Sequence, residues 1–177
     1  MGAQRLTAAA AAALLALAAG CEDGRSPDHP TAMPRTATVA RVNDGDTLTL
    51  RTGQKVRLVQ IDAPELTEDC YGRAAKRALE DLAHSGTEAE LVRDPALDDH
   101  DRYGRLLRYV YVGDTDVNVE LVRRGAASPY FFRNERGEHA DELLDAVEEA
   151  RAERRGYWGA CPAARLNTGL GSLTGPA

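Results

Sequence analysis

Four acidic residues flank two turns of this sequence in a pattern that could bind a metal cation. Asp44 and Asp46 lie on either side of a glycine, and Asp62 and Glu65 lie on either side of Ala63-Pro64. A strand that begins at the first pair and one that ends at the second would bring all four acids to one end of a hairpin. Carboxylates without neighbouring Cys or His are hard oxygen ligands, which suit Ca²⁺ or Mg²⁺ rather than zinc. Each acid taken singly also fits an ordinary turn or loop.

Two arginines could bring positive charge to the same place. Arg57 lies within a short apolar run, where a buried charge needs a partner, and Arg105 follows Tyr103-Gly104. Two guanidinium groups near a carboxylate-bound cation would clamp a phosphate, because each planar fork can donate two hydrogen bonds to it. Taken by itself, Arg57 could equally face solvent on the outside of a sheet.

Short strands and three helices are expected to position these residues. β-prone runs between turn residues predict strands over 37–42, 46–51, 55–61, 88–93 and 106–112. Apolar residues at helical spacing predict helices over 73–84, 117–124 and 138–155. Five short strands with a helix between the third and fourth fit an α+β, mainly β fold, a five-stranded Greek-key barrel of the OB type with three helices. A ferredoxin-like or other small α+β sheet would also fit.

Four segments, in order along the chain, resemble the motifs of the staphylococcal nuclease (thermonuclease) family. They are residues 42–48 (VNDGDTL), 56–65 (VRLVQIDAPE), 101–105 (DRYGR) and 117–125 (VNVELVRRG). The resemblance extends from about residue 37 to residue 158. It implies a calcium-dependent phosphodiesterase on an OB-fold barrel, which hydrolyses DNA or RNA by metal-assisted attack of water and cleaves the 5′ P–O bond.

The resemblance also implies roles for the acidic residues. Asp46 and Asp62 would bind Ca²⁺ through their carboxylates, and Ala63 would bind it through its backbone carbonyl. The family often has threonine at position 63, but a backbone donor makes alanine sufficient. Asp44 would support this metal site, and Glu65 would be the general base or would position the attacking water.

The same resemblance implies that Arg57 and Arg105 stabilise the negative charge that develops on the phosphate. Phosphodiester hydrolysis gathers charge on the phosphoryl oxygens, so two guanidinium groups and a cation aimed there would lower the barrier. Aromatic residues would supply a stacking surface for the bases. The expected substrate contacts are Arg102, Tyr103, Tyr130 and Phe131.

The first twenty residues have the pattern of a secretory signal. Arg5 precedes the uncharged run 6–19, which is too short to span a membrane and ends in small residues. Residues 17–21 (LAAGC) resemble a bacterial lipobox, so we expect lipidation of Cys21, with plain signal cleavage as the alternative. The protein is therefore expected to be exported, and either anchored to the outer face of the cell membrane by this lipid or secreted.

The rest of the chain divides by composition. Residues 21–35 are polar and carry three prolines, which predicts a flexible tether before the domain at 36–162. The segment 163–177 is expected to be a mobile tail. With Cys21 lipidated, Cys70 and Cys161 remain as a pair; in an exported protein this favours a disulfide, with two free thiols as the alternative. A monomer is the default expectation.

The charge balance favours a second function. The formal net charge is −6 at pH 7, whereas nucleic-acid-binding proteins are often basic. Net charge governs long-range steering more than the chemistry of a site. The acidity nevertheless supports an alternative, a barrel that has lost catalysis and binds nucleic acid or protein as a surface lipoprotein. Against it, the sequence retains all five key residues: Asp46, Asp62, Glu65, Arg57 and Arg105.

Overall fold

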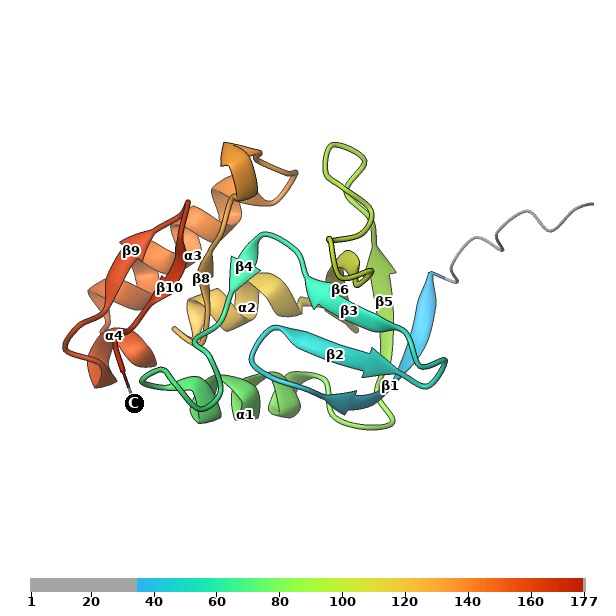
Figure 1. Ribbon diagram of the computed structural model, residues 1–177, viewed down its shortest axis with the longest axis horizontal. Helices are drawn as coiled ribbons and strands as arrows, with labels where there is room; N and C mark the ends of the chain where they lie inside the picture. Colours follow the sequence, from blue (N-terminus) through green and yellow to red (C-terminus); the bar gives the residue numbers. More distant parts are fainter. Residues whose placement is uncertain (1–34, 177) are drawn as a thin grey trace, which may run out of the picture. The chain divides into compact units, whose positions relative to one another are not determined.

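The computed structural model describes residues 35–176 of the 177-residue chain (Figure 1). The expected signal 1–20, Cys21 and all of the expected tether except Arg35 lie outside the described residues. Within 35–176, no helix has both the length and the apolar character needed to cross a lipid bilayer. The described part thus contains the expected domain and the tail that follows it.

Five strands form a closed barrel. β1 (Thr36–Val42), β2 (Thr47–Leu50) and β3 (Lys55–Leu58) pair antiparallel in sequence order, and β5 (Glu88–Val92) pairs with β1 and with β6 (Leu106–Val112). A parallel pairing of β3 with β6 closes the barrel. Closure gives every strand of the barrel a neighbour on both sides, so no edge strand is left with unpaired backbone N–H and C=O groups. The OB-type barrel predicted from the strand pattern is confirmed.

The helices lie outside the barrel (Figure 1). α1 (Gly72–Leu82) follows the third strand, α2 (Val117–Arg123) follows the short β7 (Thr115–Asp116), and α3 (Ala140–Ala152) packs against α2. They confirm the three predicted helices, with α3 two to three residues shorter at each end. A one-turn helix α4 (Tyr157–Ala160) follows α3.

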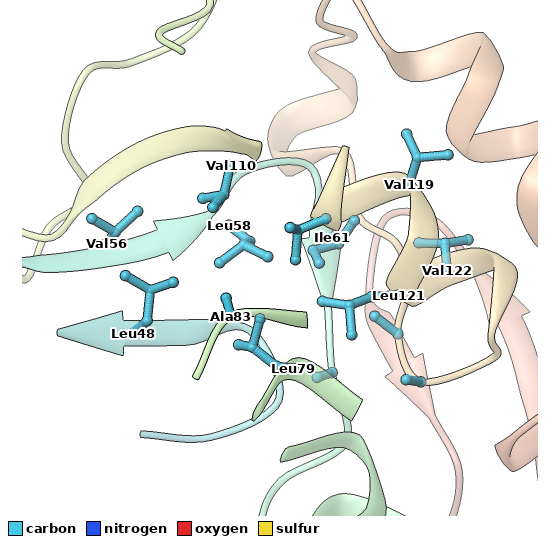
Figure 2. Packing of buried hydrophobic residues seen from close by; sticks show 14 of the residues in the cluster. Leu48, Val56, Leu58, Ile61, Leu79, Ala83, Val110, Val119, Leu121 and Val122 are labelled. Carbon is cyan, nitrogen blue, oxygen red and sulfur yellow. The ribbon is translucent and has the colours of Figure 1, made fainter. Parts of the chain in front are cut away.

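The hydrophobic core joins the barrel to the helices (Figure 2). Leu48, Val56 and Leu58 point from β2 and β3 toward Leu79 of α1, and Leu121 of α2 lies beside them. All five side chains are fully buried. Burying an aliphatic side chain of this size stabilises the fold by about 1.5–3 kcal/mol, so this shared core holds α1 and α2 against the strands that carry the acidic residues.

A buried amide fixes α2 on the barrel. The side chain of Asn118 is fully buried; its Oδ1 accepts the backbone N–H of Val110, and its Nδ2 donates to the carbonyl of Val59 at 2.8 Å. Asp116 caps the same helix by accepting the N–H groups of Asn118 and Val119. These bonds satisfy backbone groups that β6 and the loop after β3 would otherwise leave unpaired.

The third strand is shorter than predicted, because the chain turns at Gln60. β3 ends at Leu58, Gln60 has a left-handed φ of 63°, and Ile61–Asp62 forms a separate strand, β4. The buried amide of Gln60 holds this turn: Nε2 donates to the carbonyl of Glu135, and Oε1 accepts the N–H of Gly137, both at 2.8 Å. β4 pairs instead with β8 (Ser128–Pro129).

The segment after residue 162, which we expected to be a mobile tail, is folded. β9 (Arg165–Asn167) and β10 (Gly171–Leu173) form an antiparallel hairpin, and β10 packs beside β4 and β8. The carbonyl of Thr168 accepts the N–H of Phe131 at 2.7 Å. The prediction was wrong because these contacts are with residues distant in sequence, which the composition of the segment does not reveal.

The expected disulfide is present, joining Cys70 to Cys161 with Cα atoms 6.0 Å apart. It links the segment before α1 to the start of the C-terminal hairpin. The N–H of Cys70 also donates to the carbonyl of Gly175 at 2.8 Å, so the two segments are joined by a covalent bond and by the backbone.

Reduction should therefore destabilise the protein. The crosslink closes a loop of 91 residues, and its loss should lower the free energy of unfolding by about 2–5 kcal/mol. Denaturant unfolding with and without a reductant measures this, with a Cys70→Ser/Cys161→Ser double variant as the control that should ignore the reductant. Equal unfolding midpoints for the oxidised and reduced wild type would contradict the expectation.

Candidate active site at the mouth of the barrel

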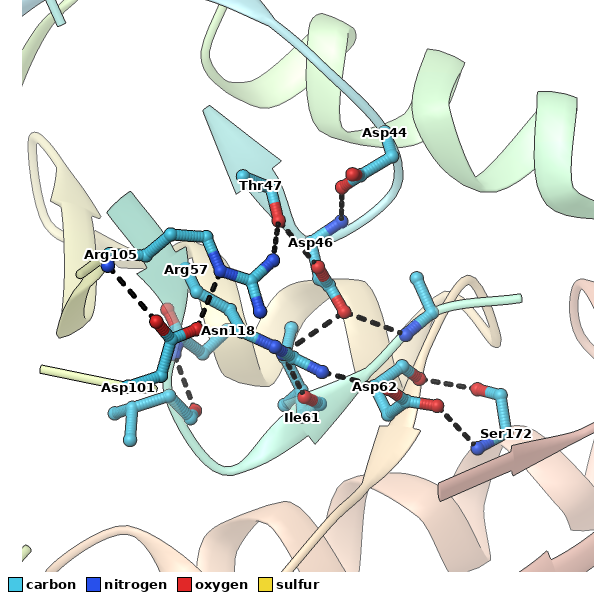
Figure 3. Close-up of polar contacts among 12 residues, drawn as sticks. Asp44, Asp46, Thr47, Arg57, Ile61, Asp62, Asp101, Arg105, Asn118 and Ser172 are labelled. Carbon is cyan, nitrogen blue, oxygen red and sulfur yellow. Dashed lines mark hydrogen bonds and ion pairs between the residues drawn. The ribbon is translucent and has the colours of Figure 1, made fainter. Parts of the chain in front are cut away.

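Arg57 bridges two of the predicted metal-binding carboxylates (Figure 3). Its Nη1 lies 3.1 Å from Oδ2 of Asp46, and its Nη2 donates to Oδ1 of Asp62 at 2.8 Å. Nη1 also donates to the carbonyl of Ile61 at 2.9 Å. The strand pairing brings these residues together. Thr47, the first residue of β2, pairs with Arg57, which places the preceding Asp46 near the guanidinium. The turn at Gln60 then brings Asp62 back to the same end of the barrel.

Several hydrogen bonds hold the turn that carries Asp44 and Asp46. The N–H of Asp46 donates to Oδ1 of Asp44 at 3.1 Å, and the N–H of Ala63 donates to Oδ2 of Asp46 at 3.2 Å. Thr47 donates its hydroxyl to Oδ1 of Asp46 at 2.8 Å. Ala63, predicted to be a backbone ligand, therefore lies beside Asp46, as expected.

The electrostatics of this cluster show an excess of negative charge. Burial and the nearby charge of Asp46 raise the pKa of Asp62 to about 6, against the opposing effects of the Ser172 N–H and Arg57. Burial and Asp46 also raise the pKa of Asp44. Desolvation acts to lower the pKa of Arg57, but the carboxylates of Asp46 and Asp62 outweigh it and raise that pKa, so the guanidinium stays charged.

The donor chemistry of the cluster fits a hard divalent cation. Asp44, Asp46 and Asp62 offer only oxygen donors, and one guanidinium does not balance three carboxylates. Within residues 35–176, no three side chains of Asp, Glu, His or Cys already form a group that could hold a metal ion. The guanidinium of Arg57 lies between the two carboxylates, so metal binding would require Arg57 to release them.

A second ion pair holds the other predicted arginine. Nε of Arg105 lies 2.6 Å from Oδ2 of Asp101, and the N–H groups of Tyr103 and Arg105 donate to Oδ1 of Asp101. Burial acts to raise the pKa of Asp101, but these hydrogen bonds prevail and lower it. Nη1 of Arg105 reaches Oγ1 of Thr47 at 3.3 Å, beside Asp46. Asp101 belongs to the 101–105 motif, but the sequence analysis assigned it no role. Its position four residues before Arg105 was a signal that the two could form an ion pair.

The two arginines and Asp62 line an open cleft of about 610 Å³. Aromatic residues border the same cleft: Tyr103 is 68% exposed, Phe132 is 52% exposed, and Tyr130 is partly buried. Arg102 also lines it and stacks over the ring of Tyr103, 4.7 Å from the centroid. Arg102, Tyr103 and Tyr130 are thus brought together, as predicted.

The structure corrects the prediction that Phe131 contacts the substrate. The sequence analysis assigned it to the substrate, but its side chain is only 2% exposed and belongs to the hydrophobic core. Its neighbour Phe132 lines the cleft instead. Phe132 begins the short 3-10 helix Phe132–Asn134, which follows Phe131 directly, and sequence alone did not say which of the two rings would be buried.

Glu65 lies in the loop between β4 and α1, and its side chain is exposed. Its N–H donates to Oδ2 of Asp69 at 2.9 Å, and its carbonyl accepts the N–H of Asp69, which closes the loop locally. Among the described residues, no hydrogen bond or ion pair engages the Glu65 carboxylate. Unlike Asp46 and Asp62, it therefore remains available to a solvent molecule or ligand.

Gly45 between the two aspartates should resist substitution. A Cβ at this position would lie 2.5 Å from Cβ of Ala63 and 2.9 Å from Cβ of Ala75, so the acidic turn packs directly on β4's exit and on α1. We expect Gly45→Ala to lower the free energy of unfolding by about 1–3 kcal/mol through overpacking. Gly169→Ala is the control, since its Cβ would meet nothing closer than 3.5 Å. Equal stability of the two variants, measured by thermal unfolding, would refute the tight packing.

Comparison with known proteins agrees with this geometry. Residues 55–160 match the family model described as staphylococcal nuclease homologue. The chain is 36% identical over 127 residues to a Haemophilus influenzae protein named uncharacterized endonuclease, covering 70% of this chain and 66% of that one. It is 38% identical over 125 residues to a protein of the same name from Escherichia coli O157:H7, covering 68% and 74%.

A third relative is the thermonuclease of Staphylococcus intermedius, 34% identical over 124 residues that cover 65% of this chain and 68% of the relative. The chain thus spans about two thirds to three quarters of the length of these relatives. The matched region contains β3, β4, the loop with Glu65 and both arginines. The chain therefore belongs to the staphylococcal nuclease family, and its domain is that of a hydrolase, a nuclease.

Proposed function

We propose that this nuclease is a calcium-dependent phosphodiesterase, which hydrolyses DNA or RNA by attack of water on phosphorus and cleaves the 5′ P–O bond. The observation that carries the proposal is the convergence of Arg57 with Asp46 and Asp62, of which Arg57 and Asp62 line an open cleft. The relatives named endonuclease and thermonuclease support the substrate class. The cleft does not share the chain's acidic excess, because its lining holds four arginines (Arg57, Arg102, Arg105 and Arg133) and four acids (Asp62, Asp98, Asp101 and Glu135).

Asp46, Asp62 and the carbonyl of Ala63 are the residues that would hold Ca²⁺, with Asp44 supporting the turn. Bound there, the ion supplies positive charge that polarises a phosphoryl oxygen. The carboxylates that now engage Arg57 would then be occupied as ligands. The guanidinium of Arg57 would then be able to donate its hydrogen bonds to the phosphate.

Arg57 and Arg105 would together stabilise the charge that accumulates on phosphorus. Arg105 is oriented by its ion pair with Asp101, and a donor fixed in place before the reaction costs no reorganisation when charge develops. Arg57 is held by Asp46 and Asp62 and would become available once a cation occupies those carboxylates. Arg105 would also assist departure of the 5′ oxygen.

Glu65 would accept the proton of the attacking water. Its carboxylate is exposed and, within residues 35–176, has no partner, so a water molecule can reach it. A general base must lie within reach of the proton it removes, and an exposed carboxylate without a protein partner is open to the attacking water.

Replacing Glu65 should abolish most of the activity without disturbing the fold. We expect Glu65→Gln to lower the cleavage rate about 10²–10⁴-fold, because the amide cannot accept a proton. The matched control is Glu68→Gln, an exposed acid of the same loop, which should cleave like the wild type. Rates on single-stranded DNA are compared for proteins with identical circular dichroism spectra. A Glu65→Gln rate close to that of the wild type would remove Glu65 from the mechanism.

Asp101 should matter through Arg105. Replacing it by Asn removes the charge that orients the guanidinium, and we expect a rate about 10–100-fold lower with the fold retained. Asp81→Asn, an exposed substitution on α1, is the control. The rate should fall mainly in kcat, because the misplaced donor acts in the transition state. A kcat equal to that of the wild type would show that Asp101 serves only the loop.

Tyr103, Tyr130 and Phe132 are proposed to contact the sugars and bases. Their rings border the cleft that the arginines line, and stacking on an aromatic ring is tolerant of base identity. Such a surface suits a nuclease that accepts DNA and RNA alike.

The pattern of residues 1–21 supports the further proposal that the protein is exported and lipidated at Cys21, with a monomer as the default state. The lipid would anchor it to the outer face of the cell membrane, and the only membrane contact would be this chain end. Cys21→Ala should move the protein from the membrane fraction to the medium, as followed by immunoblotting. Equal membrane association of the wild type and the variant would exclude the anchor.

A further inference from the structure

The C-terminal hairpin contacts a proposed calcium ligand from the far end of the sequence. The backbone N–H of Ser172 in β10 donates to Oδ2 of Asp62 at 2.8 Å, and the Ser172 hydroxyl donates to the carbonyl of Asp62 (Figure 3). Oδ1 of Asp62 is engaged by Arg57. Each oxygen of this carboxylate therefore has its own partner, and the backbone that carries it is fixed as well.

Independent contacts fix the place of the hairpin. The disulfide Cys70–Cys161 joins its start to the segment before α1, and the carbonyl of Thr168 in its turn accepts the N–H of Phe131 at 2.7 Å. Oγ of Ser172 lies 3.3 Å from Oγ of Ser128 in β8. The position of Ser172 is thus determined by the barrel side of the molecule and not by its bond to Asp62 alone.

The approach of the hairpin to the carboxylate is close. A Cβ on Gly171 would lie 2.4 Å from Oδ2 of Asp62 and 2.9 Å from its Cβ, so only a glycine lets the backbone come this near. Gly171 also has φ +85°, a left-handed conformation that glycine adopts without strain. The hairpin therefore fills the space into which the Asp62 side chain could otherwise turn.

We propose that Ser172 is a positioning residue, through which the β9–β10 hairpin presets the Asp62 carboxylate for Ca²⁺. The inference rests on the proposed function, because it assumes that Asp62 is a ligand. A ligating carboxylate that is already held by a hydrogen bond loses less conformational freedom on binding, and such outer partners commonly contribute 10–100-fold to metal affinity. The hairpin would thus be a working part of the site rather than a tail.

The test is calorimetric titration of the intact, disulfide-bonded protein with Ca²⁺ alone. Ser172→Pro removes the N–H that Asp62 accepts, and Ser172→Ala removes only the hydroxyl. We expect Ser172→Pro to weaken Ca²⁺ binding about 10–100-fold and Ser172→Ala to weaken it measurably, by up to about 10-fold, whereas Ser172→Thr keeps the hydroxyl and should bind like the wild type. Arg165→Ala in β9 is the matched control, since Arg165 is exposed and contacts only the neighbouring Ala164 carbonyl.

A second readout separates positioning from a structural role. At saturating Ca²⁺, the cleavage rate of Ser172→Ala should approach that of the wild type, because the loss lies in metal affinity. If Ser172→Pro fails to fold, Ser172→Ala decides. Wild-type affinity in the folded variants would overturn the inference and leave the proposed function standing. A wild type that binds no Ca²⁺ would overturn both, and the titration of the wild type alone distinguishes these two failures.

Discussion

The charge balance between Arg57 and its two aspartates is the constraint on which the rest of the site depends. Asp46 and Asp62 are both largely buried, and two carboxylates this close would repel each other without the guanidinium between them. In the proposed mechanism, Ca²⁺ would add positive charge to this acidic cluster and release the arginine toward the cleft. The guanidinium that stabilises the cluster in the folded protein would thereby become available to a phosphate.

The fold holds this cluster from three directions. The β2–β3 pairing sets Arg57 beside Asp46, the turn at Gln60 returns Asp62 to them, and the C-terminal hairpin closes behind Asp62. The buried contacts of Asn118 and the Cys70–Cys161 disulfide tie these parts together over long sequence distances. Asp62, a proposed metal ligand, lies on β4 and Asp46 directly precedes β2, whereas Glu65 lies on an exposed loop where water can reach it.

The sequence predicted what local patterns determine. The barrel strands and the three helices follow from alternation, helical periodicity and turn residues, and the acids and arginines were identified by type and spacing. The break at Gln60, the choice between Phe131 and Phe132, and the folding of the segment after residue 162 could not be predicted. Each depends on a tertiary partner: Glu135 and Gly137 for Gln60, the core for Phe131, and Asp62 for the hairpin.

The measurement that tests the central claim most directly is cleavage of single-stranded DNA by the purified wild-type protein, with millimolar Ca²⁺ or with a chelator. Buried carboxylates with only Arg57 between them should need a cation before the arginine can turn to a phosphate. The account predicts cleavage with Ca²⁺ and none with the chelator. Equal cleavage in the chelator would contradict a calcium-dependent site built on Asp46 and Asp62. No cleavage of DNA or RNA by a folded protein under either condition would contradict the assignment of a phosphodiesterase.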